Sequence, residues 1–335
     1  MKNKSTSWRY IFCILLLTTL LQAQSEKPTL VVYAYASFAA SWGPGPKIKA
    51  AFEKKYHCNL KFVTTSSAIS ALRKIQLEGK NTKADILMGL DKSSANIARK
   101  THLFMEHGID TSALSLPIAW HDTIFLPFDY SYFSFVYDAH KTHKVPHSFD
   151  ALLKMPKDFK IIIEDPRSST PGLGLLLWIK AVYGDKAGDY WRQLSPHILT
   201  ITKSWSEAYG LFLKGEAAMV LSYTTSPAYH IIEEHKSNYK AAPFKNGHYA
   251  QIEVSALLKS SPHKALAKKF LAFTLSETFA NIIPTTNWAY PVIKTKQGLP
   301  KGFESLYIPT HMLLLDDKEI ETNKKHYLDE WLNAL

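Results

Sequence analysis

Two blocks of alternating strand and helix patterns constrain the fold of this 335-residue chain more than any other feature. The first block opens with TLVVYAY at residues 29–35, a run of β-branched and aromatic residues that predicts a buried strand. Strand and helix patterns alternate as far as residue 89, and a second alternation begins near residue 149. This order indicates βαβ units around largely parallel strands, so we expect an α/β fold.

The individual elements follow from apolar periodicity and from the residues that interrupt it. Strands are expected at residues 29–35, 60–63, 84–89, 161–163 and 218–222, and helices at residues 48–56, 68–77, 173–182, 227–235, 264–279 and 328–335, with two more opening at Phe149 and Trp205.

Two longer extended segments, residues 125–137 and 249–257, separate the blocks. We expect them to cross between two lobes, each a mixed, mainly parallel sheet flanked by helices, with a ligand cleft between the lobes. The predicted division gives residues 28–130 and 250–335 to lobe 1 and residues 131–249 to lobe 2, with hinges near 128–137 and 249–257. A monomer is expected.

The first 23 residues predict a secretory signal peptide. Lys2, Lys4 and Arg9 precede an apolar run at residues 11–21, which is too short to span a bilayer. Its removal lowers Lys+Arg from 40 to 37 against 29 acids, a net charge of about +8. The lysines are scattered, so we expect a soluble protein exported to the periplasm that does not bind nucleic acid.

Two loops share one construction at the start of a predicted helix. Ser168, Ser169 and Thr170 precede Pro171 in one loop, and TTSP at residues 224–227 repeats the pattern in the other. One hydroxyl is enough to cap a helix, and Thr170 and Ser226 suit that position. The remaining hydroxyls, beside free amides at a positive helix end, suit an anion such as phosphate. Helix capping and anion binding therefore both remain alternative roles for the hydroxyls of these two loops.

Aromatic residues gather at strand ends and loops. Tyr35 ends the first strand, Trp205 opens a helix, Tyr223 and Tyr229 flank the second loop, and Trp288 lies in the irregular segment TTNWAYPV. Loops are usually wet, so core packing accounts for these rings less well than usual. They would offer faces to a flat or cationic heterocycle, although packing remains an alternative for each one.

No other pattern predicts catalysis, a cofactor or a metal. His140, His143 and His147 have helix-compatible spacing, but Pro146 interrupts them and no carboxylate completes a ligand set. The chain has no phosphate-binding P-loop, no GxSxG elbow and no HExxH motif. Cys58 is the one cysteine after the signal peptide, and we expect it to be a small buried core residue.

Several long motifs together resemble the periplasmic thiamine-binding proteins of Gram-negative bacteria. These are YAYASFAASWGPGP, EGKNTKADILMGLD, PFDYSYFSFVYD, DPRSSTPGLGLLLW, WSEAYGLFLKGEAAMVLSYTTSPAYH and NWAYPV. The resemblance covers nearly the whole mature chain and matches least well after Val292. It implies the type II periplasmic binding-protein fold. It also implies delivery of thiamine, thiamine monophosphate and thiamine diphosphate to the permease and ATPase of an ABC importer, without catalysis.

The resemblance also implies roles for particular residues. Ser169 and Thr170 match a loop on the phosphate side of the ligand, and Tyr35, Tyr229 and Trp288 match aromatic residues around the vitamin's rings. The other implied ligand contacts are Trp205, Tyr223, Thr224, Thr225 and Ser226.

One position departs from the family. Where its members can carry Asp-Gly after the second strand, this chain has Ser67-Ala68, which we retain as predicted ligand contacts. A carboxylate there could bond the aminopyrimidine or offset the thiazolium charge. Ser67 can still form hydrogen bonds but brings no charge, and another carboxylate such as Asp129 is a candidate replacement.

Two alternatives keep a related fold but change the function. The first is a thiaminase-like enzyme, for which Cys58 is the only mature nucleophile of the required kind. The second is a binding protein for another small cargo: iron, a polyamine or a sugar phosphate. Polyamine sites require several carboxylates, whereas the two loops are rich in hydroxyls.

Overall fold

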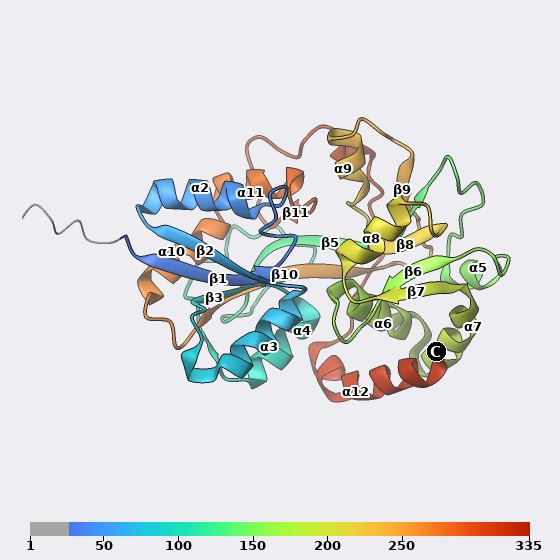
Figure 1. Cartoon of the computed structure of the whole chain (residues 1–335), viewed down its shortest axis with the longest axis horizontal. Helices are drawn as coiled ribbons and strands as arrows, with labels where there is room; N and C mark the ends of the chain where they lie inside the picture. Colours follow the sequence, from blue (N-terminus) through green and yellow to red (C-terminus); the bar gives the residue numbers. More distant parts are fainter. Residues whose placement is uncertain (1–26) are drawn as a thin grey trace, which may run out of the picture.

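The computed structural model describes residues 27–335, and the predicted signal peptide lies outside that range. Figure 1 shows two α/β lobes side by side, with strands running between them through the middle of the molecule. The strands of each lobe pair mainly in parallel and are flanked by helices, which confirms the expected fold class. None of the helices in the described range is both long enough and apolar enough to cross a bilayer.

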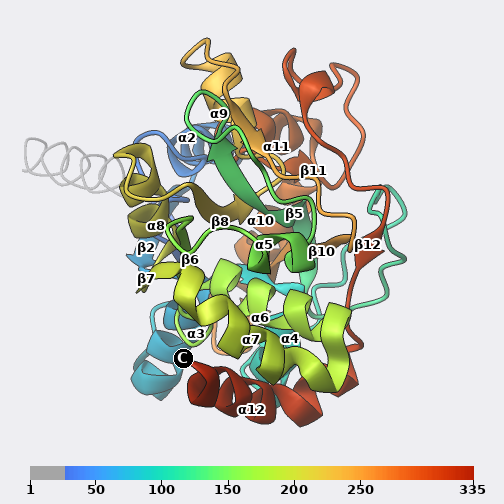
Figure 2. The same ribbon diagram turned by 90° about the vertical axis from the view of Figure 1, so that its right-hand side faces the viewer.

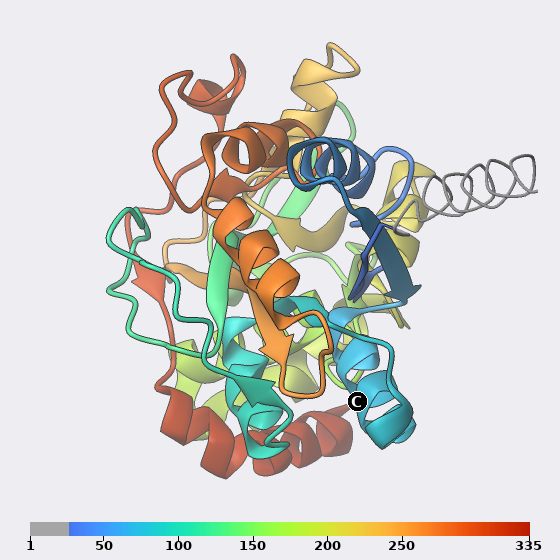
Figure 3. The ribbon, with the colours of Figure 1, turned by 90° about the vertical axis from the view of Figure 1, so that its left-hand side faces the viewer.

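Lobe 1 is built on three strands, β1 (Thr29–Tyr35), β2 (Asn59–Thr65) and β3 (Ile86–Asp91). β1 pairs in parallel with both of the others, as βαβ units require. Figure 3 views this lobe from its outer side. Its helices are α2 (Gly45–Tyr56), α3 (Ala68–Glu78), α4 (Lys92–Lys100), α10 (Lys264–Thr274) and α11 (Glu277–Ile282), with short 3₁₀ turns η1 (Gly79–Asn81) and η4 (Ile283–Thr285).

Lobe 2 repeats the plan with β6 (Ile161–Glu164), β7 (Ile198–Thr202) and β8 (Met219–Tyr223), and β6 is parallel to both neighbours. Two helices, α6 and α7, pack on one face of these strands (Figure 2), and α8 packs on the other. The helices are α5 (Phe149–Leu153), α6 (Thr170–Tyr183), α7 (Ala187–Leu194), α8 (Trp205–Leu213) and α9 (Pro227–Ile232), with 3₁₀ turns η2 (Gly184–Lys186) and η3 (Ser195–His197).

The two predicted extended segments form the long strands β5 (Leu126–Asp138) and β10 (His248–Leu258), which join the lobes. They pair antiparallel with each other, while β10 also pairs with β3 and β5 also pairs with β8. The continuous order is therefore β2-β1-β3-β10-β5-β8-β6-β7. Short segments pair beside this path: β4 (Phe104–Met105), β9 (Tyr239–Ala241), β11 (Tyr290–Pro291) and β12 (Met312–Leu313), and the turn η5 (Phe303–Ser305) precedes β12.

Some elements differ from the sequence-based expectations. The structure adds α4, α7 and β7, and it divides the helix expected at residues 264–279 into α10 and α11. The division occurs at Ser276, whose hydroxyl accepts a hydrogen bond from the amide of Phe279 and caps the second helix.

The last helix, α12 (Asp317–Ala334), begins 11 residues before the expected start at residue 328. Asp316 caps it by accepting hydrogen bonds from the amides of Lys318 and Glu319. The helix packs against α6 and α7 of lobe 2 and against α4 of lobe 1. It lies in the range that the sequence analysis assigned to lobe 1, and the lobe and hinge boundaries remain predictions.

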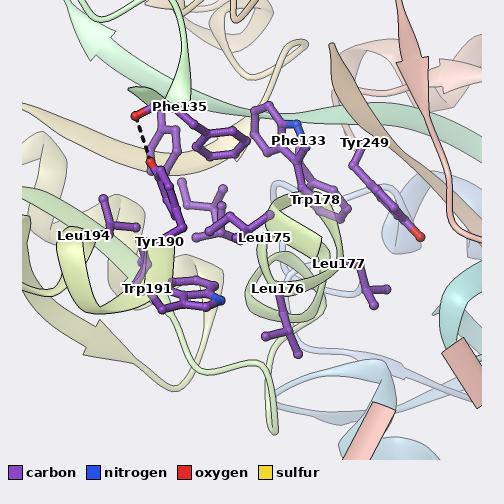
Figure 4. Packing of buried hydrophobic residues seen from close by; sticks show 14 of the residues in the cluster. Phe133, Phe135, Leu175, Leu176, Leu177, Trp178, Tyr190, Trp191, Leu194 and Tyr249 are labelled. Atoms are coloured by element: carbon purple, nitrogen blue, oxygen red, sulfur yellow. Dashed lines mark hydrogen bonds between the residues drawn. The ribbon is translucent and has the colours of Figure 1, made fainter. Parts of the chain in front are cut away.

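The largest core cluster lies in lobe 2 (Figure 4). Trp178 of α6 is fully buried there, and its indole nitrogen donates to the carbonyl of Gly247 at 3.0 Å. Gly174 faces the ring of Phe133 so closely that a Cβ atom would lie 2.1 Å from that ring. The helix that carries the first hydroxyl loop is thus fixed against the strands by close packing.

Candidate functional site

The first hydroxyl loop leads from β6 into α6. Ser169, rather than Thr170 as expected from the sequence, is the N-cap residue, and Thr170 is the first helical residue. Ser169 is buried, yet its side chain makes no capping hydrogen bond. Gly172 allows the first turn of α6 to pack closely against the end of β6, because a Cβ atom at residue 172 would lie 2.4 Å from the carbonyl oxygen of Glu164. The start of this 14-residue helix therefore keeps a hydroxyl that capping does not use.

In the second hydroxyl loop, residues 224–226, two of the three hydroxyls form hydrogen bonds with residues of β5 and β8. Thr225 Oγ1 lies 2.8 Å from Ser131 Oγ on β5. Ser226 Oγ lies 2.7 Å from Ser222 Oγ and accepts from the amide of Tyr223 at 3.2 Å. Thr224 Oγ1 is buried without a hydrogen-bond partner among the described residues. Thr224 is therefore the one residue of this loop whose hydroxyl has no partner among the described residues, whereas the hydroxyls of Thr225 and Ser226 are already bonded.

Trp205 is tied to the second loop through a chain of hydroxyls. Its indole nitrogen donates to Ser222 Oγ at 2.8 Å, and Ser222 in turn contacts Ser226. The indole also stacks on Tyr209, with ring centroids 5.0 Å apart and an angle of 26° between the planes. The first residue of α8 and the end of β8 therefore form one connected unit.

Tyr229 and Trp288 come together from distant parts of the chain. Their rings meet edge to face, with centroids 5.4 Å apart and an angle of 80° between the planes. Trp288 adopts φ of +55°, a conformation that is costly for a bulky residue, and its amide donates to the carbonyl of Ile283. Tyr229 remains 37% exposed. The pair offers aromatic surface where α9 meets the segment that follows η4.

Ser67 and Ala68 lie at the start of α3. The hydroxyl of Ser67 accepts from the amide of Ser70 at 3.2 Å, which is an N-cap, and Ala68 is buried. Farther along α3, Arg73 donates to the carbonyl of Arg167, two residues before Ser169. α3 and the first hydroxyl loop therefore contact each other from opposite lobes through Arg73 and Arg167.

Tyr35 forms hydrogen bonds with Glu253 and Asn287, two residues that the sequence-based prediction did not include. Its hydroxyl donates to Glu253 Oε2 at 2.8 Å and contacts Asn287 Oδ1 at 3.1 Å. Asn287 Nδ2 donates to Asp129 Oδ2 at 2.6 Å and to Glu253 Oε2 at 3.2 Å. Both carboxylates are buried. Each of the two apolar extended segments carries one isolated acid, and this signal points to Glu253 as well as to Asp129.

Tyr223 lies among acidic side chains. Burial raises its pKa well above the ordinary value, and the charges of Glu253, Glu164, Asp91 and Asp129 raise it further. Glu164, at the end of β6, is itself buried with neither carboxylate oxygen partnered among the described residues. Burial raises the pKa of Glu164 well above its usual range. The charges of acids on β3, β5, β6 and β10 therefore act on the tyrosine at the end of β8.

The predicted residues therefore form linked groups rather than one continuous contact set. Within residues 27–335, no group of three or more His, Cys, Asp or Glu side chains is arranged to hold a metal ion. A surface pocket of about 340 Å³ beside α3 is lined by Ser70, Arg73, Lys74, Leu77 and Glu78. It includes none of the predicted ligand contacts.

Comparisons with known proteins agree over nearly the whole chain. Residues 40–280 match the family described as bacterial extracellular solute-binding protein. The thiamine-binding periplasmic protein of Escherichia coli K12 is 48% identical over 323 residues, which cover 96% of this chain and 98% of the relative.

Solved structures of bacterial periplasmic binding proteins are also similar to this chain. One titled periplasmic thiamin binding protein has a TM-score of 0.89 at 49% identity and covers 92% of this chain and 96% of its own. The periplasmic binding protein AfuA from Actinobacillus pleuropneumoniae has a TM-score of 0.77 at 19% identity, covers 92% of this chain and 99% of its own, and supports the fold alone. The chain belongs to the bacterial extracellular solute-binding protein family, together with the thiamine-binding periplasmic proteins.

Proposed function

We propose that this protein captures thiamine, thiamine monophosphate and thiamine diphosphate in the periplasm and delivers them to an ABC importer. The observation that carries the proposal is the 48% identity, over 96% of the chain, to a relative named for thiamine binding. Several of the expected ligand contacts lie at the ends of strands or at the starts of helices, among them Tyr35, Ser67, Ser169, Trp205 and Tyr223, which supports the proposal.

The aromatic groups suit the body of the vitamin. Thiamine carries a flat pyrimidine and a cationic thiazolium, and both bind favourably to the faces of aromatic rings. Tyr229 and Trp288 meet at 5.4 Å, and the hydroxyl of Tyr35 is anchored to a buried carboxylate. Rings that are already fixed in place lose little conformational entropy when a ligand binds.

The start of α6 suits the phosphate groups. Ser169 is buried with its hydroxyl free of a capping bond, and Thr170 follows it at the first helical position. Helix N-termini present amides and a positive dipole end to anions. On this proposal, Ser169 and Thr170 donate to the phosphate of the esterified ligands, while Thr224 offers a further hydroxyl without a partner.

The environment of Cys58 favours a binding protein over a thiaminase-like enzyme. The thiol is buried in the core of lobe 1, and burial, reinforced by Glu53, raises its pKa. A nucleophilic cysteine needs the thiolate form and access to its substrate. We therefore propose a binding protein without enzymatic activity, monomeric in solution, whose partner is the permease of the importer with its ATPase.

The ligand retained by the protein tests the proposal. The mature chain is purified from periplasmic extract without added ligand, denatured, and its released small molecules are identified by mass spectrometry. We expect the masses of thiamine or its phosphates at up to one per chain. Recovery of a sugar phosphate, a polyamine or iron in that ratio, with no thiamine compound, contradicts the proposal.

A further inference from the structure

Two buried carboxylates lie opposite each other where the lobes join. Asp129 on β5 and Glu253 on β10 are partners in the antiparallel register of the two strands. Side chains of opposed residues lie on the same face of a sheet, about 5 Å apart. Asp129 is fully buried and Glu253 is 5% exposed. The strands that connect the lobes therefore hold two acids next to each other, away from water.

The pair is held in a fixed orientation by Tyr35 and Asn287. The tyrosine hydroxyl bonds Glu253 at 2.8 Å, and the asparagine amide bonds both acids, at 2.6 Å to Asp129 and 3.2 Å to Glu253. These contacts leave Asp129 Oδ1 buried without a hydrogen-bond partner among the described residues. When one acid is protonated, the two carboxyls also form a hydrogen bond with each other, so the pair can hold a proton between its acids.

In the part of the chain that the structure describes, no cationic side chain forms a salt bridge with these acids. The salt bridges of residues 27–335 include neither Asp129 nor Glu253. The titratable groups near the pair are the buried carboxyl of Asp91 on β3, which lies opposite Glu253 in the pairing of β10 with β3, and the phenols of Tyr35 on β1 and Tyr223 on β8. Burial also raises the pKa of Asp91. Glu164 adds a further buried carboxylate near Tyr223, which has no hydrogen-bond partner among the described residues. Buried charges ordinarily require a partner of opposite sign, and no salt bridge of residues 27–335 supplies one to this pair.

We infer that Asp129 and Glu253 form the counter-charge for the cationic ring of the bound ligand, and that the ligand displaces a proton from the pair. This inference rests on the proposed function, in which that cation is the thiazolium of thiamine. The groups that orient the pair also carry the aromatic faces, because Tyr35 bonds Glu253 and Trp288 directly follows Asn287. The pair supplies the negative charge that Ser67 does not bring.

The proton balance follows from the burial of the pair. Burial raises the pKa of Asp129 to about 7, and burial together with the neighbouring Asp129 raises the pKa of Glu253 well above its usual range. Without ligand, the pair therefore holds at least one proton at neutral pH. An adjacent cation favours the ionised form and lowers the pKa, so a proton leaves to solvent when the cation binds. Affinity for a cationic ligand should therefore rise with pH between about 6 and 8.

Calorimetry tests proton release on the unaltered protein. Thiamine is titrated at pH 7 in two buffers with different ionisation enthalpies, and so is a neutral analogue in which thiophene replaces the thiazolium. We expect release of a substantial fraction of one proton with thiamine and none with the analogue. Equal proton exchange with both ligands, or none with thiamine, overturns the inference.

Matched variants test the residues. Asp129→Asn and Glu253→Gln each keep the shape of the side chain and remove its charge, and Asp138→Asn removes a buried carboxylate from the far end of β5. We expect each of the first two to weaken thiamine binding at least about tenfold while binding of the neutral analogue is unchanged or tighter. Asp138→Asn should change neither affinity.

The outcomes separate the inference from the proposed function. If Asp129→Asn and Glu253→Gln weaken the binding of thiamine and of the neutral analogue equally, or leave thiamine affinity unchanged, the counter-charge role is overturned. Thiamine binding by the unaltered protein still stands in that case. Failure of the unaltered protein to bind thiamine overturns the proposed function and the inference together. Should a variant fail to fold by circular dichroism, the proton-release measurement on the unaltered protein decides.

Discussion

The ring of Tyr229 on α9 meets the indole of Trp288 edge to face at 5.4 Å, although the two residues lie 59 positions apart in the sequence. Trp288 holds this position in a left-handed backbone conformation that a tryptophan rarely adopts. Backbone strain of this kind is typical of sites where a side chain must point in one direction. The contact therefore marks the aromatic part of the proposed thiamine site.

Replacing Trp288 should weaken all three proposed ligands. On the proposed function, Trp288→Ala removes a ring that contacts the part of the vitamin common to thiamine and both phosphates. We expect a loss of roughly tenfold or more for each ligand, measured by calorimetry. Trp288→Phe keeps an aromatic face and should retain most of the affinity. An alanine variant with unchanged affinities would contradict the placement of this ring.

Ser169→Ala should discriminate between the ligands. Its hydroxyl makes no capping bond, so its loss should change the free energy of unfolding little while weakening the phosphorylated ligands more than thiamine. Ser276→Ala is the matched control, because that hydroxyl caps α11 through the amide of Phe279, is not a predicted ligand contact, and its loss should cost about 1 kcal/mol of stability. Equal affinity losses for thiamine and its diphosphate in Ser169→Ala would exclude the phosphate role.

Ser226→Ala should act on stability as well as on binding. The hydroxyl bonds Ser222 and accepts from the amide of Tyr223, so its removal leaves buried polar groups with fewer partners. We expect a loss of about 1–3 kcal/mol in the free energy of unfolding, measured with urea. It should also disturb Trp205, which bonds the same Ser222. A variant as stable as the parent protein would show that this hydroxyl chain contributes nothing to the fold.

Sequence patterns predicted the architecture because it depends on local periodicity. The strand expected at residues 29–35 has those same bounds in β1, and the two extended segments became the strands that join the lobes. By contrast, α12 begins earlier than expected because its first half is largely charged, so that apolar spacing gave no signal there. Its start is fixed instead by the cap at Asp316.

The candidate site was less accessible to sequence reasoning, because it depends on register and on long-range contacts. Glu253 meets Asp129 only through the pairing of β10 with β5, and Asn287 reaches both from a loop. Likewise, the sequence shows three hydroxyls in the second loop. It does not show that Thr225 and Ser226 bond Ser131 and Ser222.

His248 should make stability depend on pH. Burial lowers its pKa to about 4, and the neutral ring accepts from the amide of Phe244 through Nε2 and contacts the carbonyl of Phe133 through Nδ1. Because the unfolded state binds the proton more readily, this contribution is complete above pH of about 6.5 and is lost as the pH falls toward 4. The loss should reach about 3 kcal/mol at most.

Urea unfolding of the parent protein and of His248→Asn between about pH 7 and pH 4 checks this contribution. The variant should be less stable at pH 7 and should lose less stability on acidification. Parallel pH profiles for the two proteins would show that another group is responsible.

Titration of the purified mature protein with thiamine and thiamine diphosphate in a calorimeter tests the central claim most directly. We expect saturable binding of each ligand at one site per chain, with each ligand excluding the other. A folded protein that gives no binding heat with either ligand at several temperatures, and no shift in melting temperature, would contradict it.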